Sequence, residues 1–135
     1  MTRALYSALD IEAELTEFID AMEDAYEWAD FVICRSGALT VAELTSVGLG
    51  SILIPFPYAI DDHQTANARL LEANGAAVIY QQSELTFELL GKLIIKFAID
   101  PCNRLDMAKA ARKLAQNNAA DQVAKTCLEY FNAKA

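Results

Sequence analysis

The chain has 135 residues, of which 54% are hydrophobic, and its 11 basic and 19 acidic side chains give a formal net charge of −8. This length is typical of one domain with a core of its own, and no apolar run reaches the ~18 residues that a membrane-spanning helix needs. The acidic balance excludes nucleic acid as an expected partner, because phosphate backbones bind clustered Lys and Arg, and it disfavours charge-driven binding to an anionic membrane face.

Short apolar runs alternate with helical patterns along the chain. After a helical start at 2–9, strands are expected at 13–17, 31–34, 51–55 and 76–80, and helices at 20–29, 39–47, 62–73, 86–98, 103–116 and 119–132. The middle strands are apolar on both faces, which is typical of a parallel sheet covered by helices on each side. We therefore predict an α/β fold: a parallel sheet of about four strands with flanking helices and a C-terminal helical tail.

The acidic stretch DIEAELTEFIDAMEDAYE, residues 10–27, is interpreted mainly as a solvated helix face. Met22, Tyr26 and Trp28 are interpreted as packing residues rather than a cofactor-binding group. This part of the chain therefore gives no reason to expect a cofactor.

The cysteines Cys34, Cys102 and Cys127 are widely spaced, and the chain has a single histidine. That pattern favours a reducing, cytoplasmic setting over a structural zinc site or a disulfide framework. The first residues do not combine a basic segment with an apolar one, so no secretory signal is predicted. We expect neither a metal nor another cofactor.

The first loop with unusual polar content follows strand 31–34, in CRSGALTVAEL. In parallel α/β sheets, ligands bind beyond the carboxyl ends of the strands. Gly37 lets the backbone come close to a ligand, and the next helix offers unpaired N–H groups at the positive end of its dipole, which suit a phosphate. Arg35 adds a positive charge, although its side chain can instead hold the loop.

Glu43 has two interpretations. The run Thr40-Val-Ala-Glu43 matches the capping box, in which the glutamate stabilises only the start of a helix. Alternatively, Glu43 accepts hydrogen bonds from two neighbouring hydroxyls of a sugar, as the ribose-binding acid of dinucleotide folds does. The local pattern leaves both interpretations open.

The second polar loop is PFPYAIDDHQTANA, residues 55–68, in which prolines end the strand and an aspartate of the pair Asp61-Asp62 is expected to cap the next helix. Gln64 and Asn67 are three residues apart and share a helix face, so together they can bind a polyhydroxylated ligand. His63 is interpreted as a helix N-terminal residue rather than a catalyst.

Taken together, FIDAMEDAYEWADFVICRSGALTVAEL and GLGSILIPFPYAIDDHQTANARLLEANGAAV resemble the C-terminal, donor-binding lobe of the MurG family. The glycine turn, helix glutamate, proline-rich strand end and DxxQxxNA-like segment are shared across GT-B glycosyltransferases, whereas FIDxM and CRSGALT are narrower and point to the MurG family. The family transfers N-acetylglucosamine from UDP-GlcNAc to lipid I, the undecaprenyl-diphosphate-linked muramyl pentapeptide, which gives lipid II. The resemblance runs from about residue 5 to the end of the chain.

The resemblance implies donor-binding roles for three segments. The pair Phe18-Ile19 matches the uracil-binding pair, Glu43 the ribose-binding glutamate, and Arg35 the arginine of the same motif. The turn 36–40 would lie against the diphosphate and the sugar, and the segment 63–67 would recognise GlcNAc, although the family has Gln where this chain has His63. The residues so implied are Phe18, Ile19, Arg35, Ser36, Gly37, Ala38, Leu39, Thr40, Glu43, His63, Gln64 and Asn67.

The resemblance also implies a partial Rossmann-like fold and a single, truncated GT-B donor-binding domain over residues 1–135. The acceptor lobe and the first strands of the donor lobe, with the family's GGS turn, would be absent. No catalytic residue is assigned; lipid I would bind through the absent lobe, and the fragment alone is expected to be inactive. The full-length protein would be peripheral on the cytoplasmic face of the plasma membrane.

The absence of neighbouring strands leads to an expectation for the segment 13–17. In the usual strand order it would lie away from 31–34, separated by strands that this chain lacks. We therefore predict that it is displaced to pair with 31–34 or recruited into a homodimer contact, because an apolar sheet edge invites pairing.

Three alternatives remain. The first is the soluble donor subunit of a two-chain UDP-GlcNAc transferase. The second is a UDP-GlcNAc epimerase, in which an Arg/Thr/Glu/Arg-Pro-Glu-type loop would replace DDHQTANA. The third is a non-catalytic, flavodoxin-like binding module in which Glu43 is a plain helix cap.

Overall fold

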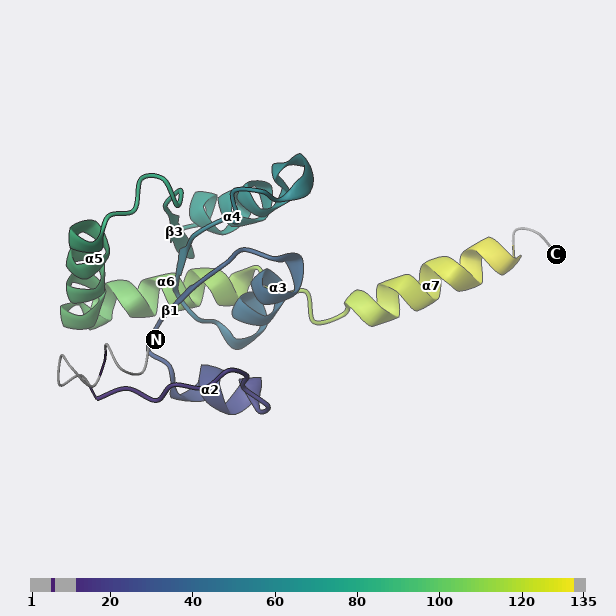
Figure 1. Ribbon diagram of the computed structural model, residues 1–135. Coiled ribbons are helices and arrows are strands. Elements are labelled where there is room, and N and C mark those ends of the chain that lie inside the picture. Colours follow the sequence, from purple (N-terminus) through teal and green to yellow (C-terminus); the bar gives the residue numbers. More distant parts are fainter. Residues whose placement is uncertain (1–5, 7–11, 133–135) are drawn as a thin grey trace.

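A computed structural model describes Tyr6 and residues 12–132, so the helical start expected at 2–9 lies, apart from Tyr6, outside the described residues. The six other expected helices are present, with ends close to those predicted (Figure 1). The elements are α2 (Met22–Trp28), β1 (Val32–Cys34), α3 (Ala38–Val47), β2 (Ser51–Leu53), the 3-10 turn η1 (Ile60–Asp62), α4 (His63–Ala73), β3 (Ala77–Ile79), α5 (Phe87–Ile99), α6 (Pro101–Lys113) and α7 (Ala119–Asn132).

Over the described residues the sheet has three parallel strands in the order β1-β2-β3, one strand fewer than expected. Ile33 pairs with Ile52, which pairs in turn with Val78, so the three strands end at the same edge. This arrangement confirms the predicted α/β class and parallel sheet.

The prediction of a strand at 13–17 is wrong. Within the described part of the chain this segment forms no strand, and β1 pairs only with β2, so the expected pairing with 31–34 does not occur. The segment 13–17, AELTE, is rich in Ala and Glu, which are depleted in strands, and it has a single large apolar side chain, Leu15. The homodimer contact at the sheet edge stays a prediction.

Each face of the sheet packs against its own core. Leu44 and Leu71, from α3 and α4, pack with Leu53 on one face, which we call the first core. Phe97 from α5 packs with Ile52 on the other face, the second core. Successive residues of a strand point to opposite faces, so the completely buried pair Ile52 and Leu53 serves both cores, as expected of a central parallel strand.

Helix α6 packs against the turn between α3 and β2, at the amino end of the central strand. Gly48 ends α3 with a left-handed backbone (φ +73°), and a β-carbon there would lie 3.1 Å from the Cβ of Arg112. At Gly50 a β-carbon would lie only 2.9 Å from the Cβ of Met107. Two glycines therefore allow α6 to cover the amino ends of the strands. The loops that follow the strands lie at the opposite, carboxyl ends.

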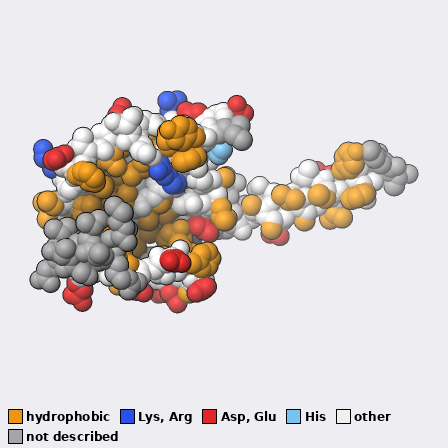
Figure 2. Space-filling view, viewed as in Figure 1, with side chains coloured by type: hydrophobic (Ala, Val, Ile, Leu, Met, Phe, Trp, Pro, Cys, Tyr) orange, Lys and Arg blue, Asp and Glu red, His pale blue; other side chains and the backbone are white. Residues whose placement is uncertain are grey.

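Helix α7 projects away from the rest of the chain, and none of its residues is buried (Figure 1). Hydrophobic side chains, among them Val123, Leu128 and Phe131, are exposed along it (Figure 2). The predicted C-terminal helical tail is thereby confirmed. Across the described residues, no helix is both long enough and apolar enough to cross a membrane.

Candidate functional site

The side chain of Arg35 joins the loops that follow all three strands. Its Nη1 donates hydrogen bonds to the carbonyl oxygens of Ile54 (3.1 Å) and Pro55 (2.9 Å), after β2. Its Nη2 donates to Oε1 of Gln82, after β3, at 2.7 Å. The guanidinium also lies 5.6 Å from the ring centre of Phe56, a cation–π distance. Arg35 therefore holds the loops together, as one of its two sequence interpretations expects, and its contact with a ligand stays a prediction.

The loop after β1 is also fixed to the start of α4. Ser36 is completely buried, and its Oγ donates to the carbonyl oxygen of Gln64 at 2.8 Å. Asn67 Nδ2 donates to the carbonyl oxygen of Ser36 at 3.1 Å. Gln64 Oε1 accepts from the backbone N–H of Phe56 at 2.9 Å. The structure thus brings Gln64 and Asn67 to the same loop corner, where both side chains orient backbone, and their binding of a sugar stays a prediction.

Helix α3 starts directly beyond that corner, with Gly37 as its N-cap and no acidic residue in its first turn. Because the backbone bonds begin with Val41 N–H to the carbonyl of Gly37 (3.0 Å), the amides of 38–40 have no carbonyl partner within the helix. Gly37 has φ −61°, and a β-carbon would come no closer than 3.9 Å to the nearest atom, Thr40 Oγ1. The fold itself does not require glycine here, so the space beside the helix N-terminus is available to a bound group.

The capping-box interpretation of Glu43 is wrong. Helix α3 begins three residues earlier than that motif requires, so Thr40 lies inside the helix and Glu43 lies in its second turn. The N-cap is Gly37, which has no side chain with which to cap the helix. The carboxylate of Glu43 is therefore not part of the helix cap.

Glu43 Oε2 accepts a hydrogen bond from the hydroxyl of Tyr26, on α2, at 3.0 Å. Tyr26 also packs against the first core, and its burial, followed by the hydrogen bond to Glu43 and the charge of that carboxylate, raises the pKa of the phenol to about 12. The sequence interpretation of Tyr26 as a packing residue missed this bond. No local signal could have found it, because the partners lie 17 residues apart on different helices.

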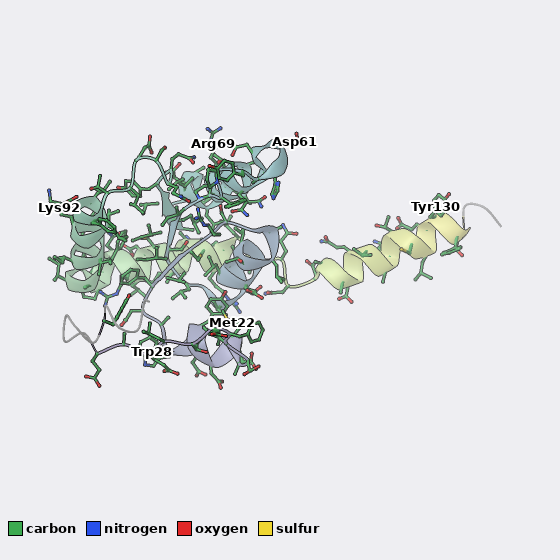
Figure 3. All side chains as sticks on the ribbon, in the orientation of Figure 1. Met22, Trp28, Asp61, Arg69, Lys92 and Tyr130 are labelled. Atoms are coloured by element: carbon green, nitrogen blue, oxygen red, sulfur yellow. The ribbon has the colours of Figure 1, made fainter. Side chains whose placement is uncertain are left out.

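Phe18 and Ile19 lie in the loop that leads into α2, and both side chains are exposed, Phe18 at 74%. A hydrogen bond from the N–H of Phe18 to Thr16 Oγ1 (3.3 Å) shapes this loop. Met22 and Trp28 lie at opposite ends of α2 (Figure 3). Trp28 is 88% exposed, so its interpretation as a packing residue is wrong.

The aspartates before α4 do not cap it in the expected way. Asp62 occupies the N-cap position, but its left-handed backbone (φ +51°) differs from the extended one of a typical cap, and within the described residues its carboxylate accepts no capping bond. Asp61 is also left-handed (φ +52°) and lies at the outer end of α4 (Figure 3). His63 is the exposed first residue of α4, as expected.

A parallel sheet whose strand ends carry a glycine turn and a helix N-terminus without a side-chain cap is the arrangement found in many α/β domains that bind nucleotides. The family model described as the glycosyltransferase family 28 C-terminal domain matches residues 1–125. The chain belongs to this family.

Two relatives carry the name UDP-N-acetylglucosamine–N-acetylmuramyl-(pentapeptide) pyrophosphoryl-undecaprenol N-acetylglucosamine transferase. The relative from Hahella chejuensis is 51% identical over 94% of this chain and 35% of its own length. The relative from Methylococcus capsulatus is 53% identical over 95% of this chain and 36% of its own length. The chain thus spans about a third of the length of the curated relatives that it matches.

A crystal structure of MurG from Acinetobacter baumannii superposes with a TM-score of 0.88 at 41% identity, over 95% of this chain and 39% of that one. The resemblance to the C-terminal lobe of the MurG family, inferred from the sequence, is confirmed, and so is the GT-B lobe fold. The assignment of individual residues to the ligand stays a prediction.

Proposed function

We propose that this chain is the donor-binding domain of an inverting glycosyltransferase that transfers N-acetylglucosamine from UDP-GlcNAc to lipid I, giving lipid II for peptidoglycan. The names of the relatives describe this transfer. The observation that carries the proposal is the start of α3. Its free amides, the open space at Gly37 and the absence of an acidic first turn together suit a diphosphate at the end of β1.

The remaining parts of a nucleotide sugar fit around that point. The exposed ring of Phe18, with the backbone of Ile19, would hold uracil, and Glu43 would accept hydrogen bonds from the ribose. The segment 63–67 begins α4 beside the same corner, so it would meet the GlcNAc hydroxyls. The donor would then lie across the ends of the strands, as ligands do in open parallel sheets.

The chemistry that this arrangement supports is displacement at the anomeric carbon. A hydroxyl of the acceptor attacks that carbon and its proton passes to a base in the region of the relatives that this chain does not span, while the bond to the diphosphate breaks and UDP leaves with the bonding electron pair. The amides of 38–40 would stabilise the negative charge that develops on the diphosphate, usually a large contribution to catalysis. Arg35 would keep the surrounding loops in place without itself moving during the step.

The relatives are longer than this chain, so the proposed binding of lipid I concerns the whole enzyme and not this domain alone. Lipid I would be bound mainly by the region of those enzymes that this chain does not span, at the cytoplasmic face of the membrane. The isolated chain is therefore expected to bind the donor but to transfer no sugar.

A titration calorimetry experiment with UDP tests the donor-binding role. Loss of the carboxylate in Glu43→Ala should weaken UDP binding about tenfold or more, because hydrogen bonds to charged groups contribute roughly 1.5–3 kcal/mol. Glu72→Ala, which removes an exposed carboxylate from α4, is the matched control and should leave the affinity unchanged. Wild-type protein that binds no UDP would contradict the proposal, and equal affinities of wild type and Glu43→Ala would contradict the ribose role.

A further inference from the structure

We propose that Tyr26 is a positioning residue for the nucleotide: its hydroxyl holds the Glu43 carboxylate in the orientation that meets the ribose. This inference rests on the proposed function and adds to it a residue that selects for ribose hydroxyls. Its basis is the 3.0 Å hydrogen bond from the Tyr26 hydroxyl to Glu43 Oε2, which joins α2 to α3.

The hydrogen bond from Tyr26 occupies only one of the two oxygens of the Glu43 carboxylate. Oε2 is occupied by the phenol, whereas Oε1 has no hydrogen-bond partner within the described part of the chain. A carboxylate oxygen can accept two hydrogen bonds, so Oε1 is free to accept from neighbouring hydroxyls of a ribose. The hydrogen bond to the phenol thus orients the carboxylate so that Oε1 is the oxygen that faces the ligand.

The Tyr26 ring is itself held in place, so it can serve as a fixed support. It packs against the first core, beside residues of α3 and β1. With a pKa of about 12, the phenol keeps its proton and remains a donor throughout the neutral range. A support of this kind lowers the entropy that Glu43 must lose when a ligand binds.

The position of Tyr26 in the chain gives the bond a second consequence. The loop with Phe18 and Ile19, proposed to hold the base, leads directly into α2, which carries Tyr26. The hydrogen bond between Tyr26 and Glu43 therefore joins the base-binding loop to the ribose-binding carboxylate. Among the side-chain hydrogen bonds of the described residues, this is the only one that connects α2 to α3.

The test compares UDP with 2′,3′-dideoxyuridine diphosphate, which lacks both ribose hydroxyls, by titration calorimetry. In Tyr26→Phe the ring remains but the donor is lost, and we expect UDP affinity to fall about three- to tenfold, the value of one ordinary hydrogen bond. The affinity for the dideoxy analogue should not change, because Glu43 has nothing to bind in it. A purely structural role for Tyr26 would instead weaken both nucleotides equally.

Tyr80→Phe is the matched control. Tyr80 is half-buried against the second core, on the opposite face of the sheet, so the same loss of a hydroxyl there should alter neither affinity. In a Glu43→Ala background, Tyr26→Phe should have no further effect on UDP. Thermal unfolding followed by circular dichroism checks that each variant is folded.

The outcomes separate the two proposals. If wild-type protein binds no UDP, the donor-binding function fails and the role of Tyr26 fails with it. If wild-type protein prefers UDP to the dideoxy analogue and Tyr26→Phe keeps that preference in full, only the role of Tyr26 is overturned. Should Tyr26→Phe not fold, a crystal structure of the wild-type chain with UDP decides: the Tyr26–Glu43 bond must persist while the carboxylate contacts the ribose, and a broken bond overturns the inference.

Discussion

The guanidinium of Arg35 donates a 2.7 Å hydrogen bond to the side-chain oxygen of Gln82, and this bond joins the loop after β1 to the loop after β3. Since β2 lies between those strands, the Arg35 side chain crosses its end and donates to the carbonyls of Ile54 and Pro55, the two residues that follow β2. The loops at the proposed donor site therefore form one connected unit rather than three separate segments.

Arg35→Lys should loosen that unit. A lysine keeps the charge, but its compact ammonium cannot reach three acceptors in the planar arrangement of a guanidinium. We expect a loss of about 1–2 kcal/mol in the free energy of unfolding, measured by urea denaturation. Gln82→Ala removes one acceptor only and should cost less. Equal stability of Arg35→Lys and wild type would contradict the structural role of this side chain.

Gly48 and Gly75 test how closely α6 approaches the turn before β2. Both have φ +73°, but a β-carbon would meet Arg112 and Ala108 at Gly48 and nothing within 4 Å at Gly75. Gly75→Ala should therefore lower the free energy of unfolding only by the cost of a left-handed backbone, about 1 kcal/mol. Gly48→Ala should lower it by about 1–3 kcal/mol more, because the added methyl group overpacks the contact with α6. Equal losses on thermal unfolding would mean that α6 lies farther from the turn.

Cys34 should resist alkylation in the folded protein. Burial raises the pKa of its thiol to about 11, whereas Cys102 and Cys127 are exposed. Because the thiolate is the reacting form, iodoacetamide at pH 8 should modify two cysteines rapidly and Cys34 slowly, as counted by mass spectrometry of peptides. Similar rates at all three positions would contradict the packing of Cys34 against the first core.

The same burial predicts how stability depends on alkaline pH. The folded pKa values of Cys34 and Tyr26, about 11 and about 12, lie above the ordinary values of 9.0 and 10.0. The folded state thus favours the neutral forms, and their stabilisation is complete below pH 9 and lost as the pH rises through about 11 to 12. The urea midpoint of unfolding, measured from pH 8 to pH 12, should fall over this window. The midpoint of a Tyr26→Phe variant should fall less steeply.

Helix α7 should exchange its amide protons much faster than α3. It has no buried residue, and an isolated helix of 14 residues is marginally stable in water. Leu44, by contrast, is completely buried in α3, so that helix should open only with the whole domain. Hydrogen exchange followed by mass spectrometry measures both, and strong protection of α7 would show that its exposed apolar side chains are covered in solution.

Much of this fold could be predicted from the sequence, because the relevant signals are local. Gly48 ends α3 and the Asn74-Gly75 pair ends α4, where glycine permits a left-handed backbone. The apolar runs at 51–55 and 76–80 indicated strands buried on both faces, and β2 and β3 lie within them. The prediction of a strand at 13–17 failed because the segment is rich in Ala and Glu, which are depleted in strands, and no described strand pairs with it.

The candidate site was predictable only in part. The position of Arg35 at the end of β1 and that of Gln64 at the start of α4 followed from the order of elements, but the partners of their side chains did not. The bond between Tyr26 and Glu43 and the start of α3 at Ala38 depend on packing between helices. The first was therefore missed, whereas the helix predicted at 39–47 begins within one residue of α3, and only the alternative of a capping box at Thr40 was wrong.

The central claim, that a nucleotide sugar binds across the carboxyl ends of these strands, is tested most directly by NMR on the ¹⁵N-labelled chain during titration with UDP-GlcNAc. The account predicts that the largest amide shifts occur at 37–40, followed by Phe18 and Ile19, while α6 at the opposite edge of the sheet is unaffected. Shifts confined to α5 and α6, with the amides of 37–40 unchanged at saturating ligand, would contradict it.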